Sequence, residues 1–345
     1  MSHLSGFRLN FIVYILALGI ILGSGYTMYK HFDFSHSVDT KSYLKMARGD
    51  FEVKVTHRYR VIVPFLAAAV AWPIETVYAK LWPNMPGTDG PLRLGFYVIN
   101  SLLVALAGLY LFKTCLAYGA SFWASAVAMA AVLSARWVVY FVGLPMIDSL
   151  YLLVFALTIY GIKTRNPWII ILCIFLGPHS KESFIFLAPL TFFYGHHAVS
   201  RVKQIGLYLV SGGLVFGLRY FIDASIDVPQ TESVDNMVDH FDNIIVSLQR
   251  IFSPKGFGEL FSIFSVFNLV ILAGLLGGKE ARKAWLSGID APLWWLVPIV
   301  IVHALLSTEV SRMLFLAAPL FAVAVALILD KHPLFAVVRE RLWLK

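Results

Sequence analysis

The sequence predicts an all-α polytopic membrane protein, in which one domain over residues 1–345 forms a bundle of about ten transmembrane helices. Hydrophobic residues make up 59% of the chain and charged residues only 14%, and the mean hydropathy is +0.76. Soluble domains are less apolar and more highly charged. Apolar runs near the length that crosses a bilayer recur along the whole chain, separated by Pro, Gly or charged residues.

Helices are expected wherever an apolar run approaches membrane-spanning length. These runs cover residues 10–29, 61–82, 91–112, 120–135, 149–162, 167–178, 183–197, 205–222, 258–277, 291–306 and 311–330. The first run follows Arg8 and lacks a small-residue cleavage pattern, so we expect a retained anchor helix instead of a removed signal peptide. Several runs fall short of the roughly 20 residues of a span, so we expect their ends to extend or the helices to pack inside the bundle.

Lys and Arg in alternate connections predict the orientation, because cytoplasmic loops carry the excess of these residues. The basic connections are KTR at 163–165, SRVK at 200–203, KEARK at 279–283 and the tail at 331–345. We expect these to be cytoplasmic, and the loops 30–60 and 223–257 to be external. The segment 120–146 leaves the count of crossings open: one helix there is re-entrant or half-length, or residues 136–146 cross the membrane once more.

The net charge of +8 does not indicate nucleic acid as a partner, because basic residues of a membrane protein mark cytoplasmic loops and anionic lipid surfaces. Membrane lipids are the expected contacts of these residues. Cys115 and Cys173 both lie in apolar sequence and indicate neither a disulfide framework nor a metal site.

The external loop 223–257 contains an amphipathic pattern. In SVDNMVDHFDNIIVSLQRIF the apolar residues recur at three- and four-residue steps, and the acidic residues occupy other faces. This spacing predicts a helix that lies on the external surface. It can serve as a lid or lipid-facing wall over a site, or only as a covering helix.

The first external loop holds the candidate catalytic group. If residues 37–48 form a helix capped by Ser37, then Asp39, Tyr43 and Met46 lie on one face. Asp39 would face the membrane or a cavity, where a partly desolvated carboxylate held ionised by nearby cations can act as a general base. The alternative is that Asp39 only belongs to the start of a surface helix.

A basic cluster closes the same loop. HRYR, residues 57–60, runs directly into an apolar span, so its guanidinium groups would lie at the external headgroup level, where paired Arg side chains suit a phosphate. Arg58 and Arg60 could equally bind lipid headgroups. Besides Asp39, the candidate substrate-binding residues are Tyr43, His57, Arg58, Arg60, Asp148, His179, Lys181, Glu182, Glu309 and Arg312.

Several of these residues also have a purely structural explanation. Asp148 can simply start a helix. Lys181 and Glu182 can form an ion pair or contact a phosphate, and Glu309 can bridge Arg312 on one helical face. An Arg at the external end of an apolar helix is costly if unpaired, which makes Arg312 a candidate for a site.

The order of a short cytoplasmic start, one helix and a loop reading VDTKSYLKMARGDF that closes in HRYRVIVPFL resembles bacterial integral-membrane glycosyltransferases of the GT-C superfamily. The segments MIDSLYLLVFAL, GPHSKESFIFLAPL and STEVSRMLFLAAP are similar to later family segments in order and side. The resemblance covers most of the chain. It implies a single glycosyltransferase domain in the bacterial inner membrane, with a GT-C-like bundle and an external, periplasmic cavity for a sugar carried on polyprenyl phosphate.

Within this resemblance, Asp39 matches the catalytic aspartate of the first loop, which would deprotonate or orient the acceptor hydroxyl during inverting transfer. The residues that would stabilise the leaving lipid phosphate are Arg58, Arg60, Lys181 and Arg312. Asp148 matches loosely, because the family often has a paired acidic motif where this chain has one Asp. A divalent metal, Mg or Mn, held by both carboxylates and a substrate phosphate is therefore left open. Without a large external domain after the bundle, a lipid-linked or glycan acceptor is expected.

Two other functions compete with this one. A transporter or flippase for an anionic lipid or small anion would use the same external cations to bind its cargo. Transporters usually show internal repeats and charged or broken helices near the midplane, whereas this sequence has no convincing repeat and gathers its charges on one side. A membrane-bound acyltransferase would use a catalytic His such as His179 or His303, but His303 lies in an apolar helix and is expected to be a hydrogen-bonded core residue.

Overall fold

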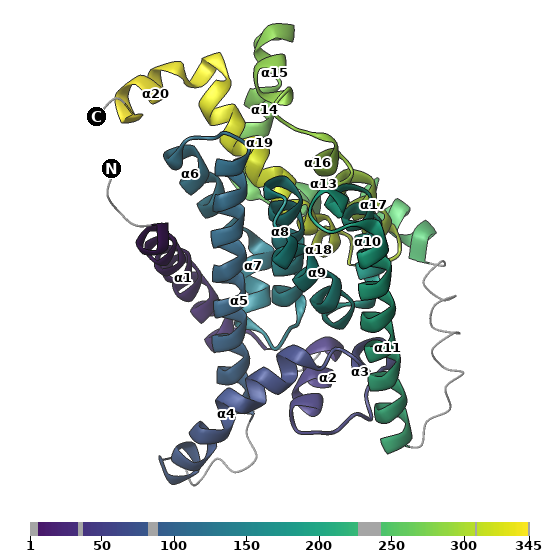
Figure 1. Ribbon diagram of the computed structural model, residues 1–345. Coiled ribbons are helices and arrows are strands. Elements are labelled where there is room, and N and C mark those ends of the chain that lie inside the picture. The colour runs from purple at the N-terminus through teal and green to yellow at the C-terminus, as the bar shows by residue number, and fades with distance from the viewer. Residues whose placement is uncertain (1–5, 34–36, 82–88, 227–242, 308, 344–345) are drawn as a thin grey trace.

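The computed structural model describes residues 6–33, 37–81, 89–226, 243–307 and 309–343 (Figure 1). Every regular element in these ranges is a helix, and no strand occurs in them. The predicted all-α class is therefore confirmed.

Several helices are suited to cross a membrane. The long apolar ones are α1 (Gly6–His31), α4 (Ile62–Leu81), α5 (Gly90–Ala117), α11 (Arg201–Ser225) and the stretch Val310–Lys331. Three sharply bent helix pairs raise the number from 5 to 8 if each pair is one span. By length and composition the chain is thus an integral membrane protein with 5 to 8 candidate spans among its described residues. The predicted count of about ten is not confirmed.

The bent pairs explain much of this difference. They are α6 (Phe122–Leu133) with α7 (Arg136–Gly143), α13 (Pro254–Ser262) with η3 (Ser265–Phe267) and α14 (Asn268–Gly274), and α15 (Gly278–Leu286) with α16 (Ala291–Trp294) and α17 (Leu296–Leu305). The first pair bends by 61° inside the segment whose crossings were left open. The break consists of Ser134 and Ala135, and the hydroxyl of Ser134 donates to the carbonyl of Ala130, a contact that often accompanies bends in helices. At the second break Ser265 has a left-handed φ of 51°.

The prediction of a single helix over residues 183–197 is wrong. That stretch forms η1 (Glu182–Phe186), α10 (Ala188–Tyr194) and η2 (Gly195–His197), pieces too short to cross a bilayer. The remaining helices are α2 (Val38–Ala47), α3 (Val55–Arg58), α8 (Asp148–Thr164), α9 (Pro167–Ser180), α18 (Val310–Leu314), η4 (Phe315–Ala317), α19 (Ala318–Lys331), η5 (Pro333–Phe335) and α20 (Ala336–Trp343).

The core of the bundle lies around α8. Every residue from Asp148 to Ile159 is buried, and α8 packs against α5 on one side and α9 on another. By contrast, α11 exposes large apolar side chains such as Phe216 and Phe221, with exposed fractions of 71% and 73%. A helix that is apolar all round is buried when it is central, as α8 is, and α11 at the periphery is suited to face lipid.

The loop 30–60, which was expected to be external, folds as predicted around α2. Ser37 caps this helix by accepting a hydrogen bond from the backbone N–H of Thr40 at 3.3 Å. Tyr43 and Met46 are fully buried on the predicted face. In Figure 1, α2 and α3 lie at the end of the molecule opposite α15 and α20, which carry basic residues of two connections expected to be cytoplasmic.

The amphipathic helix expected within 223–257 is only partly described, because residues 227–242 lie outside the described ranges. Residues 243–251 are helical. Ser247 donates a hydrogen bond to the carbonyl of Ser307 at 2.8 Å, so this segment is attached to the connection that follows α17. Phe252 just beyond it is 73% exposed, as a covering or lipid-facing element would require.

Candidate active site

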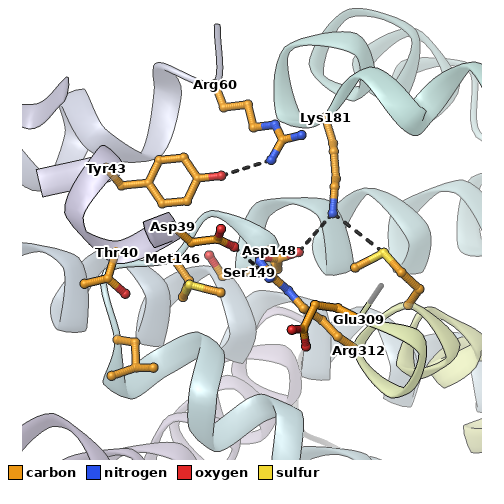
Figure 2. Close-up of polar contacts among 12 residues, drawn as sticks. Asp39, Thr40, Tyr43, Arg60, Met146, Asp148, Ser149, Lys181, Glu309 and Arg312 are labelled. Carbon is orange, nitrogen blue, oxygen red and sulfur yellow. Dashed lines mark hydrogen bonds and ion pairs between the residues drawn. The ribbon is translucent and has the colours of Figure 1, made fainter. Parts of the chain in front are cut away.

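Four segments far apart in the sequence bring charged side chains together beside α2 (Figure 2). Asp39 comes from the first turn of α2, and Asp148 is the first residue of α8. Lys181 lies between α9 and η1, and Arg312 lies in α18. We call these four residues the carboxylate cluster. The sequence predicted all four as site residues, and the structure places them in direct contact.

Arg312 connects the two carboxylates. Its Nη1 donates to Oδ2 of Asp39 at 2.8 Å, and its Nη2 donates to Oδ2 of Asp148. Arg312 and Asp148 are buried, with exposed fractions of 7% and 1%. Buried charges are costly to desolvate unless they are paired and hydrogen-bonded, so this bridge holds α2, α8 and α18 in one arrangement.

The other oxygen of each carboxylate also has a partner. His57 Nε2 lies 3.2 Å from Oδ1 of Asp39, and Lys181 Nζ lies 3.3 Å from Oδ1 of Asp148. All four carboxylate oxygens are thus engaged by nitrogen donors. Lys181 also contacts the Sδ of Met313 at 3.7 Å.

The environment controls the protonation of two of these groups. Burial alone would raise the pKa of Asp39, but the hydrogen bond from His57 and the positive charge of Arg312 together hold that pKa well below its usual range. Burial lowers the pKa of Lys181 to about 8, although Asp148 opposes the shift. Asp39 is therefore ionised at neutral pH, and Lys181 loses its charge in mildly alkaline solution.

A second group of polar side chains lies next to the carboxylate cluster. Arg60 donates through Nη1 to the hydroxyl of Tyr43 at 3.0 Å and through Nε to Oε2 of Glu182 at 3.0 Å. Arg219 of α11 approaches the other oxygen of Glu182, with Nη2 and Oε1 at 3.9 Å. The ring centroids of Tyr43 and His57 lie 5.3 Å apart, so this ring contact joins the two groups. We call Tyr43, Arg60, Glu182 and Arg219 the arginine group.

Arg219 was missed by the sequence analysis. It lies near the end of the apolar run 205–222, where an unpaired Arg is as costly as at the start of α18. The cost of an unpaired arginine at the end of an apolar helix therefore makes Arg219 a candidate for a site, as it does Arg312. Lys181 and Glu182, which could have paired with each other, instead bind different partners.

Arg58 holds the loop in place. Its Nη1 lies 3.3 Å from Oδ1 of Asp223, and its Nε and Nη2 donate to the carbonyls of Phe51 and Val53 at 3.2 and 3.1 Å. The hydroxyl of Tyr59 donates to the same Asp223 carboxylate at 2.9 Å. These contacts tie the end of the first loop to α11, and they leave Arg60 as the arginine of HRYR that faces the carboxylate cluster.

The remaining two predicted residues lie less centrally. His179 is half-buried in the last turn of α9. Glu309 is exposed, and its backbone N–H donates to the hydroxyl of Ser307 at 3.1 Å. The expected bridge from Glu309 to Arg312 is replaced, because both Nη atoms of Arg312 donate to Asp39 and Asp148.

A neutral hydrogen-bonded network supports Lys181. His303 Nδ1 lies 2.8 Å from the carbonyl of Ile299, which can only accept, so Nδ1 donates and Nε2 accepts from the hydroxyl of Tyr151 at 2.8 Å. Ser183 donates to the same hydroxyl at 3.2 Å. Lys181 Nζ lies 5.7 Å from the ring centroid of Tyr151. The prediction that His303 is a hydrogen-bonded core residue is confirmed.

The cluster does not fit a resident metal ion. Within the described ranges, no group of three or more His, Cys, Asp or Glu side chains is arranged to hold one. Asp39 and Asp148, from which such a site would have to be built, both bind Arg312, and a divalent ion there would also meet Lys181. These contacts support no step that passes through a metal.

No protein-family model, curated protein or solved structure matches this chain. Its class therefore follows from the fold and the side chains alone. The chain is a helical integral membrane protein with a buried network of acidic and basic residues beside α2.

Proposed function

We propose that the chain is an inverting glycosyltransferase of the GT-C type, which moves a sugar from a polyprenyl-phosphate donor to a lipid-linked or glycan acceptor on the external side of a bacterial inner membrane. One observation carries this proposal. An ionised carboxylate, Asp39, is bound by Arg312 and His57, and Arg312 joins it to the pair of Asp148 and Lys181. Arg60 donates to the neighbouring Tyr43, and α11 offers an apolar surface suited to lipid. Sugar transfer from a lipid phosphate needs a base for the acceptor and cations for the leaving group.

Asp39 has the role of the base. It accepts the proton of the acceptor hydroxyl while that oxygen attacks the anomeric carbon from the face opposite the phosphate. The bond from the anomeric carbon to the phosphate oxygen breaks, and its electron pair leaves with the lipid phosphate. Because His57 and Arg312 lower the proton affinity of Asp39, the proton moves only as the attacking oxygen becomes acidic, together with bond formation.

The arginine group has the role of binding the lipid phosphate. Arg60 and Arg219 share the single carboxylate of Glu182, so these three side chains have a net charge of about +1. Arginine suits phosphate because its planar fork can donate two parallel hydrogen bonds. Arg219 also lies one turn from the exposed Phe216 on α11, so a phosphate bound there would have an apolar surface for its polyprenyl chain nearby.

The proposal is tested by transfer of radiolabelled sugar from a panel of polyprenyl-phosphate sugars in membranes. Asp39→Asn keeps the shape of the side chain and removes the base. The matched control is Asp50→Asn in the same loop, because Asp50 is exposed and contacts only Lys45 and the backbone N–H of Glu52, away from the carboxylate cluster. We expect wild type and the control to consume one of the donors, and Asp39→Asn to consume it at a rate at least hundredfold lower. Equal rates of consumption by all three proteins would show that Asp39 has no catalytic role.

The three bent helix pairs favour one second candidate, because interrupted helices are common in transporters. In that case the chain would be a transporter or flippase for an anionic lipid or small anion, with Arg60 and Arg219 binding the cargo. Reconstituted liposomes distinguish the two functions. Movement of a fluorescent polyprenyl phosphate between leaflets without any consumption of sugar donors would favour the transporter.

A further inference from the structure

We infer that the guanidinium of Arg312 takes the place that a divalent cation would occupy between Asp39 and Asp148, so that the carboxylate cluster works without a metal and gains a metal site only when Arg312 is removed. The part of this inference that concerns sugar transfer rests on the proposed function. The part that concerns cation binding does not, because it follows from the contacts of the cluster.

Arg312 already holds the two oxygens that a bridging cation would need. Arg312 donates from separate nitrogens to one oxygen of Asp39 and one oxygen of Asp148. A divalent cation that bridged the two carboxylates would need the same two oxygens. Their other two oxygens are already engaged, one by His57 at 3.2 Å and one by Lys181 at 3.3 Å. An ion can therefore enter only by displacing at least one of these side chains, and an ion that bridges the two Oδ2 atoms must displace Arg312.

The charges of the carboxylate cluster already balance without a metal ion. The two carboxylates carry two negative charges, and Arg312 and Lys181 carry two positive charges, so the cluster is neutral while His57 is neutral. A divalent ion would add two positive charges at a site where Asp148 is 1% exposed. Without Arg312, the same place would hold two carboxylates and one ammonium group, a net negative charge that attracts cations.

The guanidinium of Arg312 is a permanent part of the site. Mg²⁺ and Mn²⁺ dissociate from a protein when their concentration in solution falls, whereas Arg312 is a residue of α18 and cannot dissociate. An arginine fork also fixes the relative orientation of two carboxylates, because its nitrogens lie in one plane. Asp39 thus stays ionised and oriented whatever the metal content of the surroundings.

The experiment measures Mn²⁺ binding to the purified full-length protein in detergent by electron paramagnetic resonance, with no sugar transfer involved. We expect no saturable binding by wild type up to millimolar Mn²⁺. Arg312→Ala should bind about one equivalent with a dissociation constant at least tenfold below the highest Mn²⁺ concentration at which wild type shows no binding, and the double variant Arg312→Ala/Asp148→Asn should lose that binding. Stoichiometric binding by wild type that Asp148→Asn abolishes would overturn the inference.

The matched control is Arg58→Ala. Arg58 is also a buried arginine, but it pairs with a single carboxylate, Asp223, which cannot form a bridged site on its own. A gain of Mn²⁺ binding by Arg58→Ala as large as that of Arg312→Ala would overturn the inference. That result would show that any buried carboxylate binds the ion once its arginine is removed. If Arg312→Ala does not fold, Arg312→Met, which fills the volume of the lost side chain without its charge, is titrated in its place with the same expected result.

Failure of the proposed function gives a different result from failure of this inference. If the chain does not transfer sugar, the Mn²⁺ titrations are unchanged. If it does, sugar transfer by wild type should keep more than half its rate after treatment with a chelator. Loss of transfer that Mn²⁺ restores would overturn the inference and leave the proposed function intact.

Discussion

The ion pair between Asp148 and Lys181 makes a quantitative prediction about stability. Asp148 is 1% exposed, and its carboxylate lies 3.3 Å from the ammonium of Lys181. At an effective dielectric constant near 20, two unit charges at 3.3 Å attract each other by about 5 kcal/mol. Desolvation offsets much of this attraction, but breaking such a pair leaves an uncompensated buried charge, which costs roughly 3–5 kcal/mol.

We therefore expect Asp148→Asn to lower the free energy of unfolding by about 3 kcal/mol, the lower end of that range, because the amide oxygen can still accept one hydrogen bond. Lys181→Met should cost less, since Asp148 keeps its contact with Arg312. In the double variant no unpaired ammonium remains at this position. The coupling energy of the double-mutant cycle should then be about 2 kcal/mol.

The measurement is reversible unfolding in mixed micelles, followed by tryptophan fluorescence. The control cycle uses Lys45 and Asp50, whose ion pair is 3.2 Å long and exposed, and we expect a coupling below about 0.5 kcal/mol there. Additive effects of the Asp148 and Lys181 substitutions would refute the reasoning, because they would show that the two side chains do not interact in the folded protein.

Three further predictions follow from the same network. Arg60→Ala should raise the KM for a polyprenyl-phosphate donor about tenfold, whereas Arg58→Ala should mainly lower the unfolding temperature, which steady-state kinetics and thermal unfolding separate. Because the folded pKa of Lys181 of about 8 lies below its ordinary 10.5, the unfolded chain binds more protons between these pH values, so stability should rise with pH there in wild type and rise less in Lys181→Met. Ser37→Ala should cost about 1 kcal/mol of unfolding free energy by removing the cap of α2, and Ser37→Asp should cost less than half of that.

Much of the site could be predicted from local sequence. The cap Ser37 and the buried face of α2 follow from helical spacing, and the structure bears both out. The collection of acidic and basic residues near one end of the bundle also follows, because side chains at the ends of successive apolar runs must alternate between two sides. The local pattern thus indicates which residues belong to the polar region.

Partner choice could not be predicted in this way. Arg312 bonds to Asp39 across 273 positions of sequence, whereas the near neighbour Glu309 was the expected partner. Lys181 binds Asp148 and leaves Glu182 to Arg60, because the turn between α9 and η1 directs the two adjacent side chains differently. Such pairings depend on how distant helices pack, and helical periodicity carries no information about that.

The number of membrane crossings could not be predicted from hydropathy, because it too depends on how the helices pack. Apolar runs that both pass as candidate spans form the single helix α5 and the pair α6 and α7, which bends by 61°. The break after Ser134 contains neither Pro nor Gly, the residues that usually announce one. Hydropathy measures whether a segment prefers lipid, and it does not measure whether the segment crosses or turns back.

The complete burial of α8 has a consequence for how this chain can diverge. From Asp148 to Ile159 no residue faces lipid or water, so substitutions along that stretch should be rejected at every position, without the three- to four-residue rhythm of a surface helix. On α11, side chains such as Phe216 and Phe221 meet only the surroundings and can exchange with other apolar residues. New specificity would therefore arise through the exposed side chains of α11, while the aspartate at the start of α8 keeps its position in the core.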